Sequence, residues 1–186
     1  MLTGCLFNNG AEVKILGDTS DLISLHRTVH KVTMLIVDYE LEDTEVSNLL
    51  VDFLECLEKA YTGAALREEK LIHKNRAVGY GFEISWIELL IVSNLLRYLS
   101  EYVVTDELDE INMRLLEYIT RKTISTVSEE EYLVITNYLG KRFSCVNIKQ
   151  FIKSFSCNVQ NFRRRSTYDN LNSLMAIVDI KRDEKH

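Results

Sequence analysis

Hydrophobic and polar residues alternate in parts of the first half of the chain, with the two-residue period of a β-strand. Two such runs, LTGCLFN at residues 2–8 and EVKILG at 12–17, are separated by a segment with an Asn-Gly dipeptide, a strong signal for a hairpin turn. AVGYGFEI at 77–84 alternates in the same way and predicts a further strand. The short apolar run MLIVD at 34–38 could form a third strand.

Apolar residues at helical spacing dominate the rest of the chain. The first predicted helix follows DTSD at 18–21, which offers N-cap side chains, and its apolar stripe includes Leu22 and Val29. A second amphipathic helix is predicted from Thr44 to Tyr61. After Trp86 the pattern is helical throughout, and helices are expected at about 86–103, 107–125, 129–141, 147–165 and 168–180.

The composition favours one mostly helical domain. The 186 residues contain no proline and 7 glycines, against average usages of about 5% and about 7%, so most helix breakers are missing. A chain of this length with 46% hydrophobic residues can bury one substantial core. We therefore expect a single α+β domain over residues 1–186, with the last few residues disordered. A small N-terminal antiparallel sheet or hairpin, in an α/β portion of about 1–84, would pack on a C-terminal bundle of about five helices at about 85–181.

Glu88 raises the question of catalysis, because it lies in FEISWIELLIVSNLL, the most apolar segment of the chain. A lone carboxylate in apolar surroundings can act as a general acid with a raised pKa. However, Ser85-Trp86-Ile87-Glu88 fits the capping box S/T-x-x-E, in which both side chains satisfy backbone N–H groups at a helix start. SEEE at 128–131 repeats this pattern. We therefore predict a structural cap at Glu88.

Other catalytic and metal-binding patterns are incomplete in this sequence. His26 and His30 are four residues apart, as in HExxH zinc proteases, but Arg27 stands where that motif requires Glu. No Gly-rich phosphate or dinucleotide motif occurs, and the four cysteines form no CxxC pair. We expect no metal site and no cofactor, with thiols acting as small hydrophobic side chains.

Cysteine usage and the first residues favour the cytoplasm. No basic patch followed by an apolar run opens the chain, so no signal peptide is expected, and the scattered cysteines suit a reducing compartment. The most apolar stretch, 84–99, is interrupted by polar side chains and is too short to span a bilayer. We expect no membrane anchor. The oligomeric state stays open, since the helix at 86–103 is apolar enough to lie between subunits.

Charge is strongly segregated along the chain. Residues 38–58 contain eight acidic residues and no Lys or Arg, while residues 141–165 contain seven basic residues and no Asp or Glu. The acidic block suits capture of a basic protein partner, because opposed potentials steer association and fix orientation. The residues expected to contact this partner are Asp38, Glu40, Glu42, Asp43, Glu45, Asp52 and Glu55.

Three other interpretations of the chain are open. The two charged blocks could be solvated faces, docked against each other within the fold. The basic block could bind nucleic acid, although a net charge of -6 opposes general phosphate binding. Its contacts would be Lys149, Lys153, Arg163, Arg164 and Arg165. An enzyme would be indicated by a pocket that holds Glu83 or Glu88 beside His26, His30 or His73.

Three segments carry a family resemblance: GAEVKILGDTSDLISLHRTVH, LECLEKAYTG and FEISWIELLIVSNLLRYL. They resemble a family of uncharacterised bacterial proteins, a domain of unknown function found mainly in Firmicutes. The matched positions are Gly17, Asp18, Leu22, Leu25, His30, Ala60, Tyr61, Gly63, Phe82, Trp86 and Glu88. The resemblance implies a bacterial or phage protein of the cytosol and assigns no catalytic residues. We therefore expect a non-enzymatic acidic binding protein of an inhibitor, immunity or adaptor type, in a defence-related setting.

Overall fold

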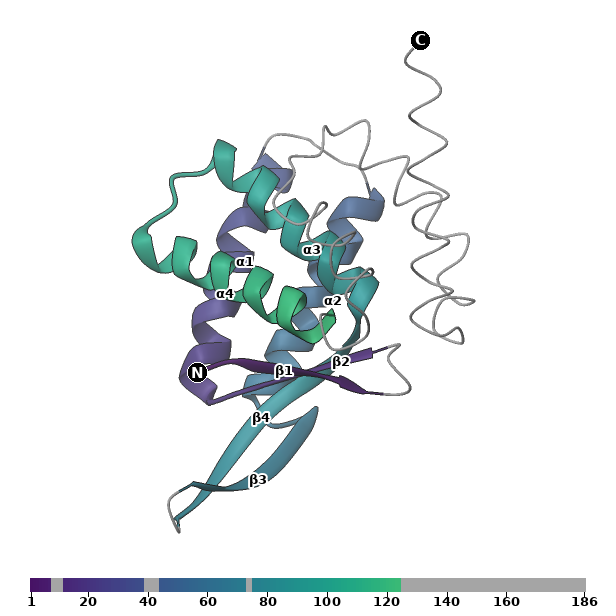
Figure 1. The fold of residues 1–186 in the computed structure, drawn as a ribbon. Coiled ribbons are helices and arrows are strands. Elements are labelled where there is room, and N and C mark those ends of the chain that lie inside the picture. The colour runs from purple at the N-terminus through teal and green to yellow at the C-terminus, as the bar shows by residue number, and fades with distance from the viewer. Residues whose placement is uncertain (8–11, 39–43, 73–74, 125–186) are drawn as a thin grey trace.

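The computed structural model describes residues 1–7, 12–38, 44–72 and 75–124. These residues form the predicted α+β fold, with four α-helices and a four-stranded antiparallel sheet (Figure 1). The helices are α1 (Thr19–Asp38), α2 (Thr44–Tyr61), α3 (Trp86–Leu99) and α4 (Glu107–Ile124), and the strands are β1 (Thr3–Phe7), β2 (Glu12–Gly17), β3 (Leu66–Ile72) and β4 (Asn75–Ser85). The helices predicted at 129–141, 147–165 and 168–180 lie outside the described residues.

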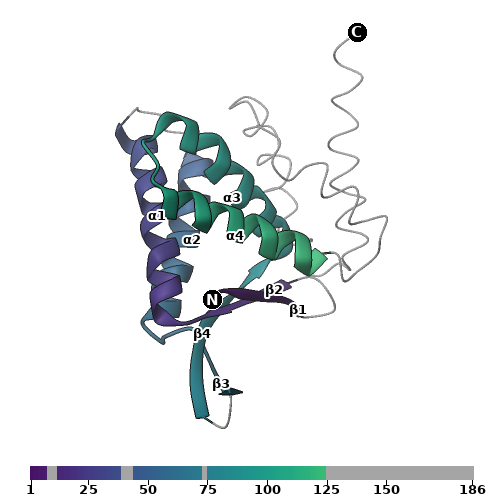
Figure 2. The same ribbon diagram turned by 60° about the vertical axis from the view of Figure 1, so that its left-hand side comes forward.

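The sheet has the strand order β1-β2-β4-β3, and each neighbouring pair is antiparallel. The four helices lie on one side of it, and α4 crosses toward β1 (Figure 2). As predicted, β1 and β2 pair as a hairpin, with Phe7 opposite Glu12. Val13 and Ile15 alternate onto the helix-covered face of β2 and are fully buried. The sheet therefore packs on the helices through one face.

β4 is the longest of the described strands, and it pairs with both β2 and β3. Residues 80–85 pair with β2, whereas residues 75–81 pair with β3. The outer part of the β3–β4 hairpin therefore extends beyond the rest of the sheet, as the lower projection in Figure 1. The sequence pattern did not predict β3, because LREEKLI is rich in charged residues and its strand partner is apparent only in the fold.

α3 forms the centre of the core. Residues 89–96 are all buried, and Trp86 at the start of the helix is fully buried. The predicted apolar stripe of α1 and the buried face of α2 belong to the same core cluster. α3 ends at Leu99 and is followed by one 3-10 turn, Ser100–Tyr102, so the helix predicted at 86–103 is nearly continuous. α3 thus lies inside the subunit.

One predicted strand was wrong. MLIVD at 34–38 forms the last turns of α1. A short apolar run is compatible with either a strand or a buried helix segment, so its composition cannot decide between them. The preceding residues decide for a helix, because Val29 and Val32 continue the helical stripe and are both fully buried.

Asp18 caps the start of α1, as the DTSD pattern predicted. Its carboxylate accepts a hydrogen bond from the backbone N–H of Asp21 at 2.8 Å and from the hydroxyl of Ser20 at 2.6 Å. The Ser20 hydroxyl, the Asp21 N–H and the nearby amino terminus of Met1 lower the pKa of Asp18 to about 2. The charged carboxylate therefore stabilises the helix start.

Charged side chains fix α4 against both α1 and α3. The buried carboxylate of Asp109 accepts hydrogen bonds from Lys31 Nζ at 2.5 Å and from the Thr28 hydroxyl at 2.8 Å, both on α1. On the other side, the guanidinium of Arg97 on α3 donates to Glu117 at 2.8 Å. These contacts hold α4 in one orientation across the layer.

The pKa of Asp109 lies below its ordinary value of 3.8. Burial acts to raise this pKa, but hydrogen bonds from Lys31, from the backbone N–H of Asp106 and from Thr28 outweigh it. A carboxyl group whose pKa is lower in the folded than in the unfolded state stabilises the fold above its unfolded pKa. That stabilisation is lost as the pH falls through the folded pKa.

Asp109→Asn is expected to lower the free energy of unfolding at pH 7 by about 2 kcal/mol, because charge-assisted hydrogen bonds are lost. The loss should shrink as the pH falls below about 4, where the wild-type carboxyl also becomes protonated. Urea unfolding of both proteins between pH 7 and pH 2 measures the difference. A loss that stays constant over this range would contradict the lowered pKa of Asp109.

Candidate functional site

Two of the predicted partner-binding residues lie together on α2. Asp52 and Glu55 are three positions apart, so they project from the same side of the helix, and both are exposed. The other residues of that prediction cannot be placed in this way. Glu40, Glu42 and Asp43 lie outside the described residues, as do the side chains of Asp38 and Glu45.

Asp52 and Glu55 border a hollow of about 450 Å³ between α2, the sheet and the start of α3. We call it the acidic groove. Its carboxylates are Glu12, Asp52, Glu55, Glu83 and Glu88, and its apolar lining includes Leu49, Ile84 and Val92. Glu12, Glu83 and Glu88 come from elements distant in sequence from α2, and the acidic block at 38–58 contains none of them.

Strand pairing brings these distant carboxylates together. Glu12, the first residue of β2, pairs with Ser85, the last residue of β4. Glu83 is two residues before Ser85, and Glu88 is in the first turn of α3 that follows it. One end of the β2–β4 pair therefore presents three carboxylates beside α2.

Glu88 forms the predicted cap of α3 while it also lines the groove. The backbone N–H of Ser85 donates to Glu88 Oε2 at 3.3 Å, and the two residues form a capping box. The carboxylate is half-buried. Among the described residues that line the groove there is no histidine, so no imidazole accompanies Glu83 or Glu88 there.

The acidic groove has a strongly negative formal charge. Five carboxylates and one ammonium group, that of Lys59, line the described part of it, which gives a formal balance of -4. Lys59 Nζ pairs with Glu55 Oε2 at 3.1 Å on the exposed surface of α2. A concave surface of one sign concentrates its field and attracts groups of opposite charge. The groove is therefore suited to cationic side chains.

Cys56 lies at the floor of this groove on α2 and is half-buried. Burial raises the pKa of its thiol, and the carboxylates of Glu88 and Asp52 act in the same direction. A raised pKa keeps the thiol protonated near neutral pH, which is unfavourable for nucleophilic chemistry. Cys56 was predicted to be a buried small hydrophobic side chain, and it is only half-buried.

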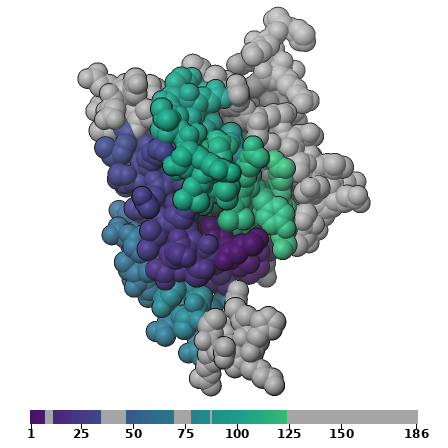
Figure 3. Space-filling model, turned by 90° about the vertical axis from the view of Figure 1, so that its left-hand side faces the viewer, coloured from purple at the N-terminus to yellow at the C-terminus, as the bar shows by residue number. Residues whose placement is uncertain are grey.

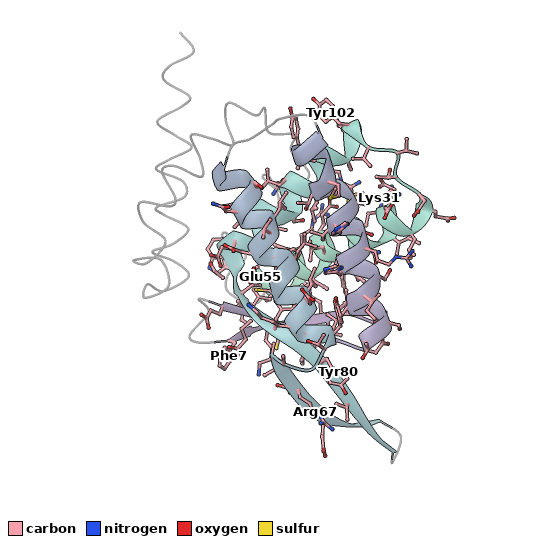
Figure 4. All side chains as sticks on the ribbon, turned by 180° about the vertical axis from the view of Figure 1, so that it is seen from behind. Phe7, Lys31, Glu55, Arg67, Tyr80 and Tyr102 are labelled. Carbon is pink, nitrogen blue, oxygen red and sulfur yellow. The ribbon has the colours of Figure 1, made fainter. Side chains whose placement is uncertain are left out.

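The two histidines of the incomplete HExxH pattern occupy a different site. His26 and His30 line a hollow of about 540 Å³ between α1 and the start of α4. Their rings stack with centroids 6.1 Å apart. Burial lowers the pKa of His26, and the neighbouring His30 lowers it further. Figure 4 shows Lys31, which lines this second hollow, well separated from Glu55 of the acidic groove.

The described residues do not assemble a Glu–His or metal constellation. Glu83 and Glu88 line one hollow and His26 and His30 another, and no group of three or more His, Cys, Asp or Glu side chains within the described ranges could hold a metal ion. His73 lies outside the described residues. The candidate nucleic-acid contacts Lys149, Lys153, Arg163, Arg164 and Arg165 also lie outside them.

No helix in the described part of the chain is both long and apolar enough to cross a bilayer.

No curated protein and no solved structure matches the chain. A family model described as "Domain of unknown function (DUF6904)" matches residues 8–184, so the chain belongs to this family.

Proposed function

We propose that this protein is an acidic binding protein that holds a basic segment of a protein partner in the acidic groove. The observation that carries the proposal is the meeting of five carboxylates from α2, β2, β4 and α3 around one hollow. Three of these carboxylates lie outside the acidic block of the sequence, so the fold adds to the charge that the sequence concentrates.

The lining indicates what kind of segment would fit. Leu49, Ile84 and Val92 supply apolar surface between the carboxylates. An amphipathic segment could place apolar side chains on this surface and Lys or Arg side chains against the acidic rim, as in helix-in-groove recognition. Apolar burial would supply affinity, and the charges would steer association and set orientation. An inhibitor or adaptor of a basic toxin or nuclease works by such surface complementarity.

Charge reversal on α2 tests the proposal. The probe is a fluorescently labelled helical peptide of Leu and Lys with its Leu residues on one face, and fluorescence anisotropy measures its affinity. Glu55→Lys is expected to weaken binding at least about tenfold, which corresponds to about 1.4 kcal/mol, because attraction becomes repulsion in the groove. Binding by the wild-type chain should also weaken as salt is added.

Glu58→Lys provides the matched control. Glu58 is exposed on the same helix, the substitution makes the same change in net charge, and Glu58 is not among the residues that line the groove. Its effect should be less than about twofold, since only distant screened charges change. Equal weakening by the two variants would show nonspecific attraction to the net charge of -6 and would contradict the groove. Retention of RNA in place of the peptide would favour the basic segment at 141–165 instead.

A further inference from the structure

The outward side of α4 carries an apolar stripe that the described part of the chain leaves uncovered. Leu108, Ile111 and Tyr118 are 53%, 52% and 51% exposed, and Leu115 between them is half-buried. Figure 3 shows α4 on the near face of the molecule. Single exposed apolar residues are ordinary, whereas exposed apolar residues gathered on one helix face are a candidate interaction site.

The spacing of this stripe is that of a coiled-coil seam. Leu108, Ile111, Leu115 and Tyr118 follow one another at intervals of three, four and three residues, which correspond to positions a, d, a and d of a heptad. The buried positions of α4 include Asp109, Asn112, Met113, Leu116 and Ile119, and Leu115 of the stripe also packs partly against the core. The helix therefore has one face for its own core and, beside it, a stripe in which Leu108, Ile111 and Tyr118 are exposed.

We propose that a second copy of this chain occupies the stripe, with the two α4 helices antiparallel. In that arrangement Leu108 packs against Tyr118 of the partner subunit, and Ile111 packs against Leu115 of the partner subunit. Each a position then faces a d position of the partner subunit, as follows from an antiparallel pairing of heptads. Because the contact is isologous, each pair occurs twice about a two-fold axis.

The charges beside the stripe fit this register. Three charged residues of α4 occupy heptad position g beside the stripe. They are Glu107, Arg114 and Arg121, which follow one another at intervals of seven residues. The antiparallel register places Glu107 opposite Arg121 of the partner subunit, so two ion pairs form per dimer. Neither Glu107 nor Arg121 forms an ion pair within the described part of the chain; Glu107 is exposed, and Arg121 is half-buried with its Nε buried.

One like-charge contact accompanies these pairs. Arg114 lies at the two-fold axis and faces Arg114 of the partner subunit. Its own Glu110 carboxylate lies 3.9 Å from Arg114 Nε and reduces the repulsion. A contact limited to one helix face is smaller than the roughly 1,200–2,000 Å² of standard interfaces. The dimer should therefore be weak and reversible, with a dissociation constant on the order of micromolar or above.

Sedimentation velocity of the full chain over a range of concentrations tests this dimer. The mass should rise from 21.6 kDa toward twice that value as the concentration increases. Ile111→Glu should keep the chain monomeric, because it places a charge at the centre of the seam. Ile23→Glu, at an exposed isoleucine on α1, should leave the association unchanged. A mass that stays at 21.6 kDa at every concentration, or dimerisation that survives Ile111→Glu, would overturn the proposal.

A charge swap tests the antiparallel register without altering the apolar seam. Glu107→Arg and Arg121→Glu should each weaken dimerisation by at least about threefold, because each places like charges opposite one another. The double variant Glu107→Arg/Arg121→Glu should restore it. Failure of the double variant to recover association while circular dichroism shows native helix content would overturn the antiparallel register.

Discussion

Gly81→Ala is expected to lower the free energy of unfolding by about 3 kcal/mol or more, because β4 has no space for a side chain at this position. A Cβ atom at Gly81 would lie 1.9 Å from the backbone oxygen of Ile15 and 2.8 Å from the Leu16 side chain. Gly81 pairs with both Leu16 of β2 and Leu66 of β3, so a shift of its backbone would disturb two strand pairs.

Gly79→Ala is the matched control in the same strand. A Cβ atom there would meet its nearest neighbours, the backbone oxygens of Glu68 and Gly17, at 3.7 and 3.8 Å, which is ordinary van der Waals contact. Its effect should be within about 1 kcal/mol, and a small gain is expected because alanine restricts the unfolded chain. Urea unfolding followed by the fluorescence of Trp86 measures both variants. Equal unfolding midpoints would contradict the steric role of Gly81.

Trp86→Ala is expected to destabilise the protein by about 3–5 kcal/mol, the range observed when a large buried aromatic side chain is truncated. Trp86 is fully buried where the sheet passes into α3, and it belongs to the core cluster that the described residues form. Its removal would leave a cavity between elements that other contacts hold in place. Because Trp86 is the one tryptophan in the chain, circular dichroism at 222 nm must follow the unfolding of this variant.

Trp86→Phe tests whether the cost of Trp86→Ala comes from lost side-chain volume. The indole Nε1 of Trp86 is buried and has no hydrogen-bond partner among the described residues, so phenylalanine would remove an unsatisfied donor. We expect a cost below about 1.5 kcal/mol, since most of the aromatic volume stays. If Phe were as destabilising as Ala, the cavity explanation would be wrong.

Residue patterns within a short stretch of sequence were sufficient to predict some of the helices. These helices have an apolar stripe and, at one end, a capping or terminating residue. α2 begins and ends where its pattern predicted, and α4 begins at the predicted residue and is helical as far as Ile124, the last described residue. MLIVD at 34–38 failed because a short apolar run has no period of its own. β3 was missed because its strand character depends on pairing with β4, a contact that local patterning does not encode.

The acidic groove could be predicted only in part for a similar reason. Charge density along the sequence pointed to Asp52 and Glu55, which lie on one face of α2. Glu12 and Glu83 join them through the β2–β4 register, and no spacing rule relates these residues to α2. The sequence identified Glu88 as a cap, which is confirmed, but its place in the groove depends on how α3 packs beside α2.

Alkylation of Cys56 is the most direct test of whether a basic segment occupies the acidic groove. Cys56 lines the groove, whereas Cys5 is exposed on β1 and does not line it, so one protein sample contains both the probe and its control. Saturation with the Leu–Lys peptide should slow the reaction of a small maleimide at Cys56 at least about fivefold and leave Cys5 unchanged, as measured by peptide mass mapping. An unchanged rate at Cys56 while the peptide is bound would contradict the proposed binding site.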